Sequence, residues 1–65
     1  MTEKQINDIN YVIRGNLYNA SSQLHNSWIL AFSVVEDQEV SDKLQTAMKT
    51  LLEVLDIYEQ RSKED

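Results

Sequence analysis

The sequence predicts an all-α protein, built as an antiparallel hairpin of two helices. The 65-residue chain contains no proline and a single glycine, Gly15. It has no sustained alternation of apolar and polar residues and no Asn-Gly or Asp-Gly turn, so strands are not expected. Apolar residues instead recur every three or four positions in two stretches, separated by the polar segment EDQEVSD. This spacing is typical of amphipathic helices.

The first helix is expected to run from about residue 3 to residue 35. Thr2 and Gln5 have the spacing of a capping box, which places the helix start near Glu3. One side of this helix is apolar, and we call it the aliphatic stripe. Its members are Ile6, Ile9, Ile13, Leu17, Ala20, Leu24, Trp28, Ala31 and Val35. Their spacing repeats every eleven residues, close to the natural period of a helix, so the stripe stays on one side.

The second helix is expected over about residues 38–62, with Asp37 or Ser41 as its N-cap. Its apolar seam consists of Val40, Leu44, Ala47, Leu51, Val54 and Tyr58, and it is widened by Met48, Leu52 and Leu55. Acidic residues near its start and basic residues near its end suit the helix dipole. Because the connection is short, the two helices should pack antiparallel.

The two helices differ in length, and this difference leaves two architectures open. Laid beside the first helix, the second would reach back only to about residues 12–14, so residues 3–13 would project beyond it. In one architecture the first helix is continuous and its projecting part packs on another subunit. In the alternative, the chain breaks near Gly15 and forms a monomeric three-helix bundle. A glycine inside a helix costs only ~1 kcal/mol, and the stripe keeps its register from Ile13 to Leu17. We therefore favour the continuous helix.

A second face of the first helix predicts an interface. Tyr11, Tyr18, His25 and Phe32 recur every seven residues, well to one side of the aliphatic stripe, and Ile29 lies with them. We call these five residues the aromatic face. Near Trp28–Val35 the helix is apolar almost all round, as expected for a helix buried on several sides. We therefore expect two hairpins to form a dimeric four-helix bundle. The predicted interface residues are Ile6, Ile9, Tyr11, Tyr18, His25, Ile29 and Phe32.

No pattern in the sequence indicates catalysis or a bound cofactor. The chain is short enough to be one domain, residues 1–65, and it has no cysteine for a disulfide or a thiolate metal site. His25 is the only histidine, and no carboxylate or second histidine lies three or four residues from it. A metal site and a serine–histidine catalytic pair both need such partners. We therefore expect no enzyme activity, no metal and no cofactor.

The charge favours protein partners over nucleic acid. The net charge is −5, and residues 36–65 hold nine acids and four bases, whereas residues 1–35 hold two of each. Binding to phosphates needs a basic stripe, and no stretch is apolar and long enough for a membrane span. The sequence thus predicts a small, acidic, cytoplasmic interaction module, namely an adaptor, chaperone-like factor or regulator. Its expected partners are its own copy and another protein. The alternative is an acidic inhibitor that mimics nucleic acid and blocks a basic protein.

Overall fold

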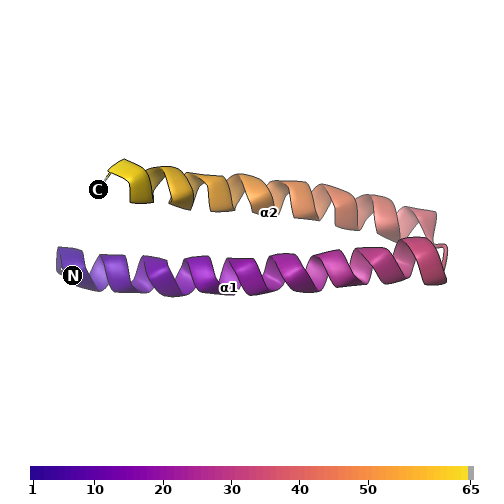
Figure 1. Cartoon of the computed structure of the whole chain (residues 1–65), viewed down its shortest axis with the longest axis horizontal. Coiled ribbons are helices and arrows are strands. Elements are labelled where there is room, and N and C mark those ends of the chain that lie inside the picture. Colours follow the sequence, from indigo (N-terminus) through magenta and orange to yellow (C-terminus); the bar gives the residue numbers. More distant parts are fainter. Residues whose placement is uncertain (65) are drawn as a thin grey trace.

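Two long helices joined by a short turn form a hairpin, as predicted. The computed structural model describes the backbone of residues 1–64 and the side chains of residues 1–61. Helix α1 spans Glu3–Ile29, a π-helical segment η1 spans Leu30–Val34, and helix α2 spans Gln38–Glu64. Figure 1 shows α1 and α2 lying side by side and antiparallel, with both chain ends at one end of the molecule. We call this the open end, and the opposite one the connection end.

The start of α1 is fixed by the predicted capping box. The backbone N–H of Gln5 donates to the Thr2 hydroxyl at 3.1 Å, and the backbone N–H of Thr2 donates to the Gln5 side-chain oxygen at 2.8 Å. These bonds satisfy donors that a helix N-terminus otherwise leaves unpaired. The start at Glu3 is therefore confirmed.

Helix α1 continues through Gly15 without a break. No glycine in the described chain has a positive φ, and a Cβ placed at Gly15 would have no heavy atom within 4 Å. The continuous helix is thus confirmed, and the predicted alternative of a break near Gly15 is not formed.

The connection differs from the expected simple helix end. We call α1 and η1 together the first helical segment. Its last turn, η1, is wider than an α-helical turn, and the backbone N–H of Val35 donates to the Leu30 carbonyl there at 3.0 Å. The N–H of Asp37 reaches the Ala31 carbonyl at 2.8 Å across Glu36, whose φ is 58°. A residue in this left-handed conformation commonly ends a helix, and it is usually glycine or asparagine.

Helix α2 begins where the sequence predicts and ends two residues later. Asp37 is its N-cap, because the Asp37 carboxylate accepts the backbone N–H of Val40 at 3.1 Å. The Asp37 carbonyl also accepts the first intrahelical bond, from the N–H of Ser41 at 2.9 Å. The helix continues to Glu64 rather than residue 62.

The interior of the hairpin is narrow. Among the described side chains only Ser41, Leu55 and Ala31 are buried, with 1%, 5% and 8% of their surface exposed. The members of the aliphatic stripe from Ile13 to Ala31 face α2 and are half-buried or buried, whereas Ile6, Ile9 and Val35 are exposed. On α2 the inward-facing residues are Ser41, Leu44, Met48, Leu51, Val54, Leu55, Tyr58 and Glu59. The inward side is therefore rotated from the predicted seam, since Val40 and Ala47 are exposed.

The projecting part of α1 is shorter than residues 3–13. Figure 1 shows the last turn of α2 reaching nearly as far as the first turn of α1. Two features shorten the projecting part relative to the predicted one. Helix α2 runs to Glu64, and the i→i+5 bonding of η1 changes the geometry of the last turn before the connection.

Replacing Gly15 with alanine should stabilise the hairpin by up to ~1 kcal/mol, because alanine has the higher helix propensity and restricts the unfolded chain. The open surroundings of Gly15 leave room for the methyl group. Urea denaturation at one fixed protein concentration measures this change. A loss of stability would contradict the continuous helix.

Replacing Glu36 with glycine should also stabilise the hairpin, by ~1 kcal/mol or less, because glycine adopts a positive φ without the steric cost of a Cβ. Glu36→Ala is the matched control: it removes the same charge but keeps the Cβ. Equal stability of the two variants in denaturation would show that the left-handed conformation carries no such cost.

Candidate interaction surface

All seven predicted interface residues are exposed in the hairpin. Ile6 and Ile9 lie near the open end of α1, on the stripe that turns toward α2. The five residues of the aromatic face follow one flank of the first helical segment, from α1 into η1, and Tyr11 has 71% of its surface exposed. The structure therefore places a long, exposed, largely apolar strip beside the line where α1 meets α2.

Helix α2 also contributes to this surface, through Met48 and Leu52, which belong to the predicted apolar seam, and through Glu59, which lies outside that seam. Met48, Leu52 and Glu59 adjoin the aromatic face, and Leu52 is exposed. Their spacing of four and seven positions on α2 was visible in the sequence. No local pattern in the sequence indicated how α2 is rotated about its own axis, and this rotation turns these three residues toward the aromatic face.

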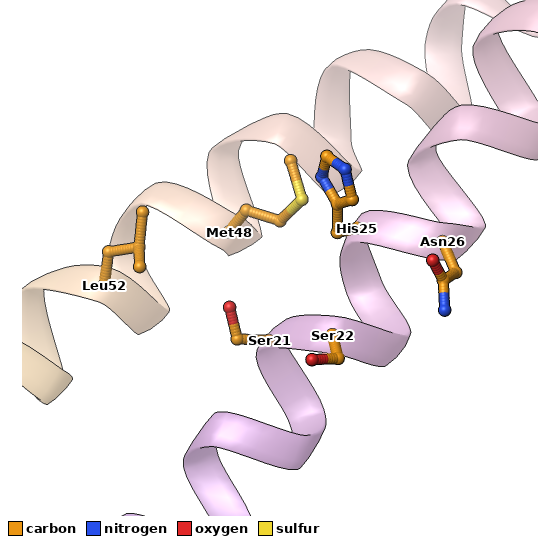
Figure 2. Close-up of a pocket in the computed structure, with 6 residues that line it drawn as sticks. All are labelled: Ser21, Ser22, His25, Asn26, Met48 and Leu52. Carbon is orange, nitrogen blue, oxygen red and sulfur yellow. The ribbon is translucent and has the colours of Figure 1, made fainter.

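A groove between the helices lies at the middle of the surface. It has a volume of about 360 Å³ and is lined by Ser21, Ser22, His25, Asn26, Met48 and Leu52. Figure 2 shows Met48 and Leu52 of α2 across the groove from the α1 residues, with the Met48 side chain pointing toward His25. Asn26 stands at the edge of the groove and points away from α2. The lining is polar on α1 and apolar on α2.

Aromatic rings connect this groove to the connection end. The ring centroids of His25 and Trp28 are 6.1 Å apart, and those of Trp28 and Phe32 are 5.3 Å apart with an interplanar angle of 17°. Trp28 also belongs to the half-buried aliphatic stripe. Stacked rings at such separations attract one another beyond their burial, so Trp28 holds the aromatic face against the interior.

Phe32 borders a second groove at the connection end. This groove, about 420 Å³, is lined by Phe32, Ser33, Glu36, Asp37, Gln38 and Ser41. The buried Ser41 hydroxyl donates to the Gln38 carbonyl at 3.1 Å. The surface is therefore acidic at this end, where Glu36 and Asp37 stand beside an exposed ring.

Tyr18 of the aromatic face also contacts α2 of the same hairpin. Its hydroxyl donates a hydrogen bond to the Glu59 carboxylate. This bond raises the pKa of the Tyr18 hydroxyl, and desolvation and the negative charge of Glu59 act in the same direction. Arg14 opposes the rise in pKa. Arg14 also lies over the ring of Tyr11, at 5.8 Å from its centroid.

The described residues contain no group of three or more His, Asp or Glu side chains that could hold a metal ion. In the same part of the chain, neither helix is both long and apolar enough to cross a lipid bilayer. No protein-family model, no curated protein and no solved structure matches this chain.

The Tyr18 hydroxyl should titrate above its ordinary pKa of 10.0. In the variant Tyr11→Phe/Tyr58→Phe, Tyr18 is the only tyrosine, and the ultraviolet absorbance of tyrosinate reports its ionisation alone. Because folding raises the pKa of Tyr18, the protonated hydroxyl contributes to the free energy of unfolding. This contribution to stability is complete below pH 10 and is lost as the pH rises through the pKa of folded Tyr18.

Adding Glu59→Gln to that variant removes the negative charge and should lower the pKa of Tyr18 toward its ordinary value. An unchanged pKa would show that Glu59 is not the cause of the shift.

Proposed function

We propose that this chain is a small interaction module that acts by self-association and by contact with another protein, without catalysis. Two hairpins would pack through their aromatic faces into a four-helix bundle. The observation that supports this most directly is the amount of surface that a single hairpin leaves in water.

The hairpin exposes 5268 Å². A compact monomer of 7.6 kDa exposes about 4,300 Å², so the hairpin has an excess of about 1,000 Å². If two copies each lost that excess, the interface would bury about 2,000 Å², the upper end of the range for stable complexes of standard size.

The shape supports the same proposal. The radius of gyration is 15.0 Å, whereas a compact domain of this length has about 11 Å. The molecule measures 48 × 16 × 15 Å, so it is one helix pair thick along its whole length. A second pair alongside would give the cross-section of a four-helix bundle, in which each helix can bury a wide apolar side.

Contact with another protein is supported by apolar residues outside the aromatic face. Leu30, Val34 and Val35 are exposed at the connection end, on other sides of the helical segment from Ile29 and Phe32. Pairing through the aromatic faces would leave them available. Exposed apolar groups of this kind mark protein contacts when they lie together.

Catalysis has little support from the groove around His25. Ser21 and Ser22 line the groove together with His25, but its lining includes no carboxylate to orient the imidazole. The acidic-mimic alternative is also less well supported, because Lys43 and Lys49 stand among the exposed acids of α2. The lack of cysteine agrees with a cytoplasmic location.

Ile29→Ala should weaken self-association while Ile57→Ala leaves it unchanged. The two isoleucines are similarly exposed, 40% and 48%, but Ile29 lies on the aromatic face and Ile57 on the outer side of α2. Ile29→Ala removes three carbons from each copy, and about 40% of the Ile29 surface is exposed and can be buried by association. At ~0.8 kcal/mol per fully buried carbon, the change should cost ~2 kcal/mol per dimer, or a ~30-fold rise in Kd.

Sedimentation equilibrium over a range of concentrations measures both Kd values, and far-UV circular dichroism checks that each variant remains helical. A wild-type chain that stays at 7.6 kDa throughout, with a melting temperature independent of concentration, would refute self-association.

A further inference from the structure

His25 is the only histidine of the chain, and along the sequence it is the third of the five residues of the aromatic face. Its side chain is exposed in the single hairpin, and its ring centroid lies 6.1 Å from that of Trp28. Figure 2 shows the Met48 side chain pointing toward His25 across the central groove. A second copy packed on the aromatic face would therefore cover the imidazole.

The groove around His25 contains no acid that could pair with a protonated imidazole. Its other lining residues are all uncharged, namely Ser21, Ser22, Asn26, Met48 and Leu52. On α2, the charged residues within four positions of Met48 or Leu52 are Lys49, Glu53 and Asp56. All three are exposed to water and none of them lines the groove.

The first helical segment of a second copy would also bring no acid to this position. Between residues 9 and 35, Arg14 and His25 are its only ionisable side chains apart from tyrosine. In a parallel pair the imidazole would meet the region around the partner's own imidazole, and in an antiparallel pair the region around Arg14. Glu59, the acid of α2 that adjoins the aromatic face, already accepts the hydrogen bond from Tyr18.

From this setting we infer that protonation of His25 controls self-association: the neutral imidazole allows the aromatic face to be covered, and the imidazolium prevents it. Histidine is the side chain that ordinarily changes its charge between pH 5 and 8. Association should therefore be strong above pH 7 and weaken as the pH falls below it. This inference depends on the proposed self-association through the aromatic face and adds its regulation.

The physical reason is the cost of covering a charge that has no counter-ion. A neutral imidazole can be buried against aromatic and apolar neighbours, whereas an unpaired cation loses its hydration without compensation. The stack on Trp28 attracts an imidazolium. That contact is already present in the single hairpin, so it does not compensate for the hydration that association removes.

The overall charge of the molecule acts in the opposite direction, but weakly. Protonation adds one positive charge to each copy, whose net charge is −5, and this reduces the repulsion between copies. Exposed charges more than ~8 Å apart are largely screened at physiological ionic strength. A charge inside the interface is not screened in this way, so the cost of covering the imidazolium is the larger effect.

Sedimentation equilibrium at pH 7.5 and pH 5.5 tests the inference. Histidine ordinarily titrates near pH ~6.5. Because the single hairpin binds a proton that each copy in the dimer excludes, lowering the pH favours the single hairpin. If both copies exclude the proton completely, Kd should rise by up to about 100-fold between the two pH values.

His25→Gln is the control, because glutamine is polar and neutral but has no proton to gain in this range. Its Kd should be nearly the same at both pH values. A wild-type Kd that does not change with pH, or a His25→Gln variant that keeps the wild-type pH dependence, would overturn the inference and leave self-association intact. A wild-type chain that is monomeric at both pH values would instead refute the proposed self-association, and the inference with it.

The ring protons of His25 give a second measurement on the unaltered chain, which decides the question if glutamine itself weakens packing. Proton NMR follows the titration of this single imidazole directly. Its midpoint should move to lower pH when the protein concentration is raised above Kd, because association excludes the proton. A midpoint that is independent of protein concentration would contradict the inference.

Discussion

The main constraint on this fold is that two helices enclose very little space. Each helix can turn only one side toward the other, and three described side chains, Ala31, Ser41 and Leu55, are buried as a result. The aliphatic stripe of α1 is mostly half-covered, and apolar groups on both flanks remain in water. The long shape, the exposed aromatic face and the open grooves all follow from this shortage of interior.

The segment Trp28–Val35 has the highest density of apolar residues because it performs two tasks in a short length. Trp28 and Ala31 close the interior next to the connection, and the stacked ring of Phe32 extends the aromatic face to its end. The π-helical widening of η1 and the left-handed Glu36 then reverse the chain, and Asp37 starts the next helix. The two acids after the apolar run thus belong to the turn and to the cap of α2.

The helices could be predicted from the sequence because their signals are local. The Thr2–Gln5 capping box, the spacing of the aliphatic stripe and the start of α2 each depend on residues a few positions apart. The relative rotation of the two helices is not local. For that reason the hydrogen bond from Tyr18 to Glu59, 41 positions away, was missed, as was the contribution of Leu52 to the surface. Neither η1 nor the left-handed Glu36 had a signal, since Glu36 is not a residue type that favours positive φ. The interface assignment itself stays a prediction.

The rod-like shape affects how the molecule moves in solution. Its radius of gyration of 15.0 Å equals that of a compact globular domain of roughly 150 residues. In gel filtration, which separates molecules by hydrodynamic size, one hairpin should therefore elute ahead of globular proteins of the same mass and resemble a species of higher mass. A second hairpin packed alongside adds thickness but little length, so doubling the mass should change the elution volume only modestly. Elution volume alone is consequently a poor measure of how many chains are present.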